Sequence, residues 1–381
     1  MGHINIKSYL LITACIAAST ASAASPQLRL QQRSTFDNTN GTYPVTAPLV
    51  ALNGTLYGTT SFGGDNNLGV VYRTRPNGHI DVLHSFNGSD GSYPYGTLVA
   101  GLHGTMYGTT TTGGAFDQGV VYSIAPNGAF NVVHSFNGSD GSVPSSVLWL
   151  PDGYLYGTAS GGGDFGEGIV FRMTLSGDLT ILHSFTQEEG FSPNGLASDW
   201  SGNLWGATQF GGAAQQGTIY RIARDGSNFT LVYTFDGGIQ GGDVSQALIA
   251  GCDGAMYGTT QYGGTYNAGT LFRVSHSGGV DTLHSFGAGA DGAYPGGGSP
   301  IALGPTCHFY GLAEFGGTLG GGTLYEADAY GNVRSLYNFD STVGQASVQI
   351  AWPNEIIVTE ATAGPLQAGV ILRGNLPFGW W

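Results

Sequence analysis

The sequence carries little charge, and lysine is almost absent from it. Charged residues make up 9% of the 381 residues, Lys7 is the only lysine, and the formal net charge is -14. A nucleic-acid groove or an anionic membrane surface needs a stripe of basic side chains, and the sequence holds none. We therefore expect no nucleic acid among the partners of this protein.

Cysteine and long hydrophobic runs are scarce as well. The chain has 3 cysteines, too few for a disulfide scaffold, so the fold must depend on its core. After the N-terminal segment no run of about 18 apolar residues occurs, and we expect no stable membrane insertion. Hydrophobic residues still make up 41% of the chain, which excludes a solvated disordered chain.

Glycine, in contrast, is abundant. The chain has 67 glycines, more than twice the usual share of roughly 7%. They follow no strict G-x-y period, which excludes collagen. They also disfavour long helices, where each glycine costs about 1 kcal/mol relative to alanine. The composition therefore indicates a globular protein made of strands and turns.

The N-terminus has the features of a secretory signal peptide. Lys7 supplies positive charge, residues 8–18 are mostly apolar, and Ala21-Ser22-Ala23 fits an A-x-A cleavage site. We expect residues 1–23 to be removed and the protein to be secreted, either extracellular or periplasmic. An alternative is a lipoprotein in which Cys15 is lipidated.

A repeat of about 50 residues organises the rest of the chain, as in the step from Tyr57 to Tyr107. Each unit contains Y-G-T-T-x-x-G-G, then G-V-V-Y, then H-S-F. The first anchor recurs at Tyr57, Tyr107, Tyr156, Trp205, Tyr257, Tyr310 and, in degenerate form, Ile357. The second begins at Gly69, Gly119, Gly168, Gly217, Gly269, Gly322 and Gly369.

Each unit holds four short runs rich in β-branched and aromatic residues, which is typical of a propeller blade. The last unit ends before an H-S-F strand, whereas Ser34-Thr35-Phe36 supplies one at the start of the chain. We therefore predict an all-β, seven-bladed β-propeller of four-stranded blades, closed by the N-terminal strand. Residues 24–381 form this single domain, with blades at about 41–86, 91–136, 141–185, 190–235, 241–286, 292–339, and 345–374 plus 27–36.

The pattern Y-G-T-T-x-x-G-G…G-V-V-Y…L-H-S-F-x-G-x-D-G resembles the GloVer tandem-repeat family of exported bacterial proteins. The resemblance covers nearly the whole chain after residue 23 and implies a secreted or surface-displayed propeller. It implies no particular reaction. Some relatives carry a C-terminal sorting anchor, whereas this chain ends in Pro377-Phe378-Gly379-Trp380-Trp381, so we expect a released protein and a monomer.

Loop lengths separate the two rims of the predicted ring. Tight Asn-Gly, Asp-Gly and Ser-Gly turns occupy one rim, and longer loops with aromatic and acidic residues occupy the other. We expect the ligand site on the longer-loop rim, near the central channel. Polar residues follow the second strand of each unit, at Ser61, Thr111, Ser160, Gln209, Gln261, Glu314 and Glu360.

Glu314 and Glu360 are the only carboxylates in this set, and they belong to neighbouring blades. Two nearby carboxylates can share general-acid and nucleophile or base roles, as in a glycosidase. They could instead bind Ca²⁺, which prefers oxygen ligands, or merely solvate the rim. We expect no other cofactor and no metal cluster.

Aromatic and amide side chains on the same rim are candidate ligand contacts. Aromatic faces could stack on sugar rings, although their recurrence also fits packing between blades. The candidates are Phe62, Gln209, Phe210, Gln261, Tyr262 and Phe315.

Cys252 and Cys307 lie at or near the same tight turn in adjacent blades, where they could form a disulfide. The sequence contains no G-x-S-x-G elbow and no H-E-x-x-H pair. We predict a secreted binding or scaffold module for an extracellular neutral glycan or protein. The alternative is a secreted carbohydrate-active enzyme, a glycoside hydrolase or lyase, that uses Glu314 and Glu360.

Overall fold

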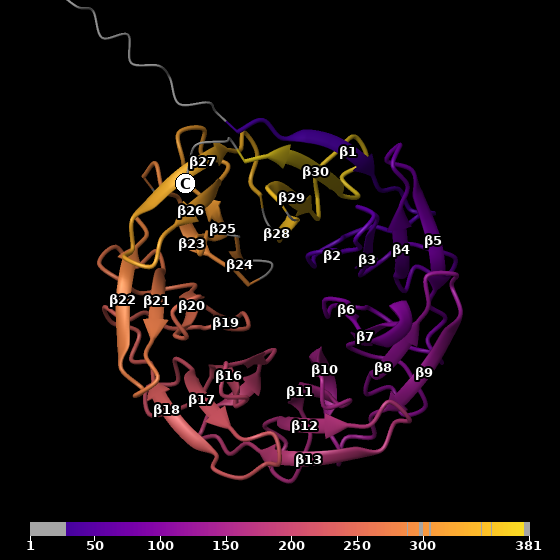
Figure 1. Ribbon diagram of the computed structural model, residues 1–381, viewed down its shortest axis with the longest axis horizontal. Coiled ribbons are helices and arrows are strands. Elements are labelled where there is room, and N and C mark those ends of the chain that lie inside the picture. Colours follow the sequence, from indigo (N-terminus) through magenta and orange to yellow (C-terminus); the bar gives the residue numbers. More distant parts are fainter. Residues whose placement is uncertain are drawn as a thin grey trace, which may run out of the picture.

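The computed structural model describes residues 28–376 except 288, 297–299, 305, 344 and 352. Over these residues the chain forms seven antiparallel sheets in a ring (Figure 1). In six of them the first strand is innermost and the last outermost, and in the seventh β28 is innermost and β1 outermost. The prediction of a seven-bladed propeller is confirmed. The predicted signal peptide at 1–23, Cys15 and the C-terminal residues 377–381 lie outside the described residues.

The first three blades follow one another along the chain. Blade 1 contains β2 (Leu49–Val50), β3 (Leu56–Thr60), β4 (Val70–Thr74) and β5 (Ile80–Ser85). Blade 2 contains β6 (Val99–Ala100), β7 (Met106–Thr110), β8 (Val120–Ile124) and β9 (Phe130–Ser135), with a short 3-10 turn, η1 (Leu102–Gly104). Blade 3 contains β10 (Ser142–Trp149), β11 (Leu155–Gly161), β12 (Ile169–Met173) and β13 (Leu179–Ser184).

In blades 4 and 6 the innermost strand is split in two. Blade 4 contains β14 (Phe191–Pro193), β15 (Ala197–Ser198), β16 (Leu204–Phe210), β17 (Thr218–Ile222) and β18 (Thr230–Thr234). Blade 5 contains β19 (Ile249–Ala250), β20 (Met256–Thr260), β21 (Thr270–Val274) and β22 (Val280–Ser285). Blade 6 contains β23 (Ala293–Pro295), β24 (Ala302–Leu303), β25 (Phe309–Phe315), β26 (Thr323–Ala327) and β27 (Val333–Asn338).

Blade 7 joins the two ends of the described chain. It contains β28 (Ala346–Ala351), β29 (Glu355–Glu360) and β30 (Val370–Asn375), and its outer strand is β1 (Gln31–Thr35). Strand β1 pairs antiparallel with β30, from Gln31 opposite Arg373 to Thr35 opposite Val370. The N-terminal strand therefore closes the ring as predicted, which leaves no open edge on β30.

The repeated Y-G-T and G-V-V-Y strings fit each other across the second and third strands. In blade 2, Gly108 lies opposite Tyr122, whose side chain is fully buried. A Cβ atom on Gly108 would lie 2.5 Å from the Tyr122 hydroxyl, so the glycine leaves room for the ring. The repeat therefore places a tyrosine on the third strand opposite a glycine on the second, and the absent glycine side chain makes space for the tyrosine ring.

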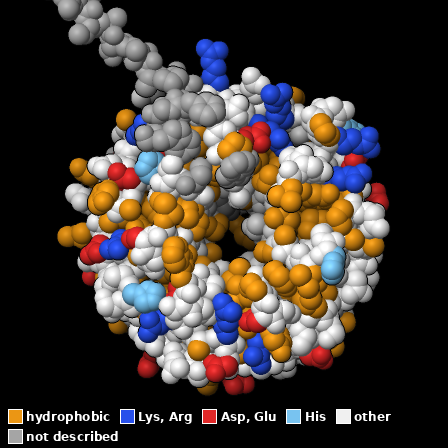
Figure 2. All heavy atoms as spheres, viewed as in Figure 1, with side chains coloured by type: hydrophobic (Ala, Val, Ile, Leu, Met, Phe, Trp, Pro, Cys, Tyr) orange, Lys and Arg blue, Asp and Glu red, His pale blue; other side chains and the backbone are white. Residues whose placement is uncertain are grey.

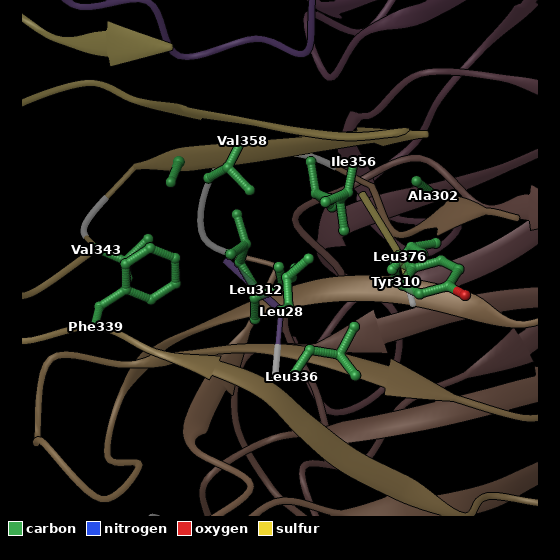
Figure 3. Close-up of a cluster of buried hydrophobic side chains, with 13 residues drawn as sticks. Leu28, Ala302, Tyr310, Leu312, Leu336, Phe339, Val343, Ile356, Val358 and Leu376 are labelled. Atoms are coloured by element: carbon green, nitrogen blue, oxygen red, sulfur yellow. The ribbon is translucent and has the colours of Figure 1, made fainter. Parts of the chain in front are cut away.

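The hydrophobic core consists of clusters between neighbouring blades. Figure 3 shows the cluster between blades 6 and 7, where Leu28 lies beside Leu312, and Phe339 lies beside Val343. Leu376 joins the same cluster, so both ends of the described chain contribute to it. Burial of these side chains holds the closing strand against the ring.

A disulfide joins two adjacent blades on the tight-turn side of the ring. Cys252 lies in the turn between β19 and β20, and Cys307 lies between β24 and β25. Their Cα atoms are 5.7 Å apart.

Figure 2 shows a central opening on one face of the molecule, with hydrophobic side chains gathered beside it. Within the described ranges, no helix has the length and apolar character that crossing a membrane requires.

Candidate functional site

A central cavity on the ring axis, lined by residues of all seven blades, is the candidate binding site. Its volume is about 560 Å³, within the range usual for small-molecule sites. Strand entries and second-strand ends of several blades line it, among them Ser146, Asn194, Gln246 and Gln345. Most of the lining side chains are hydroxyls or amides, so the cavity is polar but almost uncharged.

Five of the predicted polar residues face this cavity. They are Thr111, Ser160, Gln209, Gln261 and Glu314, from blades 2 to 6. The structure therefore brings together one member from each of five successive blades. Ser61 of blade 1 is only 6% exposed and does not belong to the lining.

Glu360 does not belong to this set, because its assumed equivalence is wrong by one residue. In blade 1, Thr60 pairs with Val70 and Ser61 follows; in blade 7, Glu360 pairs with Val370 and Ala361 follows. Glu360 is therefore the counterpart of Thr60, and Ala361 is the counterpart of Ser61. Because successive side chains in a strand point to opposite faces, this shift places Glu360 on the buried side.

A count along the sequence contained the signal for the correct register. Ser61 precedes the Gly69 anchor by 69 − 61 = 8 residues, and Glu314 precedes Gly322 by 322 − 314 = 8 residues. Glu360 precedes Gly369 by 369 − 360 = 9 residues, whereas Ala361 precedes it by 8. The degenerate first anchor gives the same register, because Ser61 follows Tyr57 by 61 − 57 = 4 residues and Ala361 follows Ile357 by 361 − 357 = 4 residues.

The two glutamates differ in their electrostatic surroundings. Burial raises the pKa of the Glu314 carboxyl above its usual range. Burial and the nearby negative charge of Asp340 raise the pKa of Glu360 to about 7. The negative charge that raises the pKa of Glu360 thus comes from Asp340 and not from Glu314.

The loops that enter blades 1 to 6 each hold a non-glycine residue in the left-handed backbone region. Its φ lies between 52° and 65°, at Tyr43, Tyr93, Val143, Ser192, Asp243 and Tyr294. Such a conformation is unusual for bulky or β-branched residues and costs on the order of 1–3 kcal/mol. These residues went unrecognised in the sequence, although most of them precede the proline of a G-x-x-P repeat.

Hydrogen bonds to the preceding blade hold these six residues in place. Each backbone N–H donates to a carbonyl of the blade before it, at 2.8–3.2 Å: Tyr43 to Ala368, Tyr93 to Leu68, Val143 to Gln118, Ser192 to Glu167, Asp243 to Gln216 and Tyr294 to Ala268. The carbonyls of Tyr93 and Asp243 in turn accept the N–H groups of Thr111 and Gln261. These six residues and their hydrogen bonds form a backbone belt around the rim. The lining residues Thr111 and Gln261 are bonded to this belt.

Aromatic side chains on this belt form two groups of three rings. In the first, Phe62 lies edge-on between Tyr43 and Tyr93, with ring centroids 5.9 and 5.3 Å apart. In the second, Tyr294 lies between Tyr262 and Phe315, at 5.6 and 5.8 Å.

A separate pair joins the predicted contact Phe210 to Phe191, with centroids 5.4 Å apart. Phe62, Phe210, Tyr262 and Phe315 are 37–44% exposed, so they pack together and still offer surface.

The recurring histidines form local ion pairs on the outer strands. His84 lies 3.0 Å from Asp90, His134 lies 3.0 Å from Asp140, and His284 lies 2.8 Å from Asp291. His308 does not reach Glu314 but lies 3.1 Å from Glu326, which also accepts the Tyr310 hydroxyl at 2.8 Å. Over the part of the chain that the structure describes, no group of three or more His, Cys, Asp and Glu side chains could hold a metal ion.

The ring of blades and its cavity define a propeller built from sequence repeats. The chain belongs to the Gloeobacter/Verrucomicrobia repeat family, whose model matches residues 21–151 and 144–354. This confirms the resemblance read from the repeat. The comparison with curated proteins finds no match.

Solved structures with a similar fold share little sequence with this chain. A puromycin-hydrolysing peptidase of Mycobacterium tuberculosis aligns with a TM-score of 0.60 at 12% identity, covering 92% of this chain and 55% of that one. A puromycin hydrolase aligns with a TM-score of 0.59 at 11% identity, covering 90% and 54%. This chain thus spans about half the length of these two hydrolases, and the likeness concerns the fold alone.

Proposed function

We propose that this protein is an extracellular binding propeller whose central cavity takes a neutral, hydroxyl-rich ligand such as a glycan. The observation that carries the proposal is the ring of uncharged side chains at Thr111, Ser160, Gln209 and Gln261. Hydroxyl and amide groups both donate and accept hydrogen bonds, which matches the hydroxyl groups of a sugar.

The surroundings of the cavity support this ligand class. Half-exposed rings such as Phe62 and Tyr262 offer apolar surfaces on which sugar rings can stack. The hydrogen-bonded belt fixes the positions of the contacts before the ligand arrives, which lowers the entropy cost of binding. Secretion is part of the proposal and is supported by Lys7, the apolar segment 8–18 and Ala21-Ser22-Ala23.

A carbohydrate-active enzyme is the second candidate. Glu314 in the cavity, with its pKa raised by burial, has the property expected of a general acid. Glycoside hydrolysis uses two carboxyl groups on either side of the bond, however, and Glu314 is the one carboxylate in the described lining. The binding proposal therefore accounts for more of the lining residues than the enzyme proposal does.

Titration calorimetry with neutral hexasaccharides tests the proposal, using cellohexaose, xylohexaose, mannohexaose and N-acetylated chitohexaose. We expect at least one of them to bind, and Gln209→Ala with Gln261→Ala to weaken binding about 10-fold or more through the lost hydrogen bonds. Gln32→Ala is the matched control, because Gln32 is an exposed glutamine on the outer strand β1.

Two results would contradict the binding proposal. If no neutral glycan binds the wild-type protein, the ligand class is wrong. If binding persists unchanged in the double variant, the cavity is not the site. New reducing ends in the same samples, lost in Glu314→Gln, would favour the enzyme instead.

A further inference from the structure

We propose that the central cavity selects a glycan unit that carries a primary ammonium group, bound by Glu314. The inference rests on the proposed glycan-binding function and changes it in one respect, because one unit of the otherwise neutral glycan carries a positive charge. An amino sugar has the required chemistry, because it combines hydroxyl groups, an apolar ring face and one positive charge.

The charge distribution of the cavity is the first support. Glu314 is the single charged side chain in the described lining, and the other lining side chains are hydroxyl, amide or apolar groups. Because one carboxylate faces several neutral donors and acceptors, the cavity matches a ligand with one cationic group among many hydroxyl groups. A ligand without charge would leave this carboxylate half-buried and unpaired.

The protein itself supplies no counter-ion to Glu314 in the described part of the chain. Burial is the cause of its raised pKa, with no contribution from a neighbouring charge or hydrogen bond. Several arginines pair with carboxylates on other elements, Arg73 and Arg75 with Asp81, Arg273 with Asp253, and Arg373 with Glu355, and none of the described ion pairs includes Glu314. An ammonium group from the ligand would therefore satisfy a group that the fold leaves without a cation.

The second ring group lies on the same rim but outside the cavity lining. Phe315 follows Glu314 directly in β25, and because successive side chains in a strand point to opposite faces, its ring does not share the face of the carboxylate. Tyr262 and Phe315 are each 44% exposed, and both contact Tyr294 edge-on. The preference for a charged ligand therefore depends on Glu314 and not on these rings.

The first ring group provides a contrast within the same rim. Phe62 lies between Tyr43 and Tyr93 in a similar edge-on arrangement, but its neighbour at the equivalent position is Ser61. Ser61 is neutral and buried. Exposed aromatic side chains thus lie in two sectors of the propeller rim, whereas the Glu314 carboxylate lies in only one of them.

The test compares a glucosamine hexamer with its fully N-acetylated counterpart, at a pH where the amines are protonated. The two ligands share ring number and linkage and differ in charge. We expect wild-type protein to bind the amine form about 10- to 100-fold more tightly, the range expected for a hydrogen bond between charged groups. Glu314→Gln should bring this preference close to onefold, chiefly through weaker binding of the amine hexamer.

Asp65→Asn is the matched control, since Asp65 is an exposed carboxylate in the loop between β3 and β4 and the change alters net charge equally. Equal affinities for the two hexamers, or a preference that survives in Glu314→Gln, would overturn the inference and leave the glycan proposal standing. Failure of both hexamers to bind would overturn the inference, and the glycan proposal would fall with it only if cellohexaose, xylohexaose and mannohexaose also fail to bind. Tri-lysine binding as tightly as the amine hexamer would show that the ammonium group is recognised without a sugar, which also overturns it.

Discussion

Blades 6 and 7 each place a glutamate at the end of the second strand, but the two side chains meet different surroundings. Glu314 occupies the position that faces the cavity, and Glu360 occupies the preceding position, which is buried in every blade. The counterparts of Glu360 are Thr60, Thr110, Ala159, Thr208, Thr260 and Ala313. A shift of one residue along the second strand thus separates Glu314, which faces the cavity, from Glu360, which is buried.

The two blades also differ in how the chain completes them. Blade 6 is continuous and is tied to blade 5 by the Cys252–Cys307 disulfide. Blade 7 depends on β1, which no short loop connects to β30. Four predictions test whether these differences in chemistry and connection have the expected consequences.

The largest effect is expected for the closing strand. Phe36 is fully buried against Tyr72, and its counterpart Phe339 ends the outer strand of blade 6. Phe36→Ala and Phe339→Ala should each cost about 3–5 kcal/mol in urea unfolding. Only Phe36→Ala should also speed hydrogen exchange at β30, because no short loop connects β1 to β30 and loss of packing can release the whole strand.

An identical exchange pattern in the two phenylalanine variants would contradict this distinction. The closing strand would then be as firmly held as the outer strand of a continuous blade.

Removing the disulfide should have the next largest effect. The two cysteines are separated by 55 residues, so the double variant Cys252→Ser, Cys307→Ser should lose about 2–4 kcal/mol of unfolding free energy. Reduced wild-type protein is the control and should match the variant. Equal urea midpoints for oxidised and reduced wild type would show that the bond contributes nothing.

Glu360→Gln should change how stability depends on pH. The pKa of Glu360 is about 7 in the folded protein, above its ordinary value of 4.5, so the folded state binds more protons between these values. Its unfolding free energy therefore falls as pH rises through this range. The variant should avoid this loss, gaining about 1–3 kcal/mol at high pH and almost nothing at low pH.

Thermal unfolding across this pH range measures the effect, and Asp340→Asn should reproduce part of it by removing the neighbouring charge. A Glu360→Gln profile parallel to that of wild type would contradict the buried position of this acid.

Glu314→Gln should have the smallest effect on stability, less than about 0.5 kcal/mol at any pH. The side chain faces the open cavity, and solvent there limits the cost of its charge. Calorimetric melting of this variant beside Asp65→Asn would check it. A large stabilisation would mean that Glu314 is a strained core residue rather than a ligand contact.

The repeat predicted the architecture and five of the residues that line the cavity, for identifiable reasons. The spacing between anchors placed Thr111, Ser160, Gln209, Gln261 and Glu314 on one rim, and the missing last strand predicted the closure by β1. The left-handed residues such as Tyr93 were not predictable from residue type, because a hydrogen bond to the preceding blade imposes that conformation. A proline after such a residue normally favours an extended conformation instead.

The closing strand also constrains the order of folding. Gln31 and Arg373 pair across 373 − 31 = 342 residues, so the first strand to leave the ribosome must wait for the last. The strands of blades 1 to 6 can pair with their neighbours as they emerge from the ribosome, but the ring cannot close before β30 has been synthesised. A chain that crosses a membrane from its N-terminus would thus remain an open arc during passage and become a ring only on the far side.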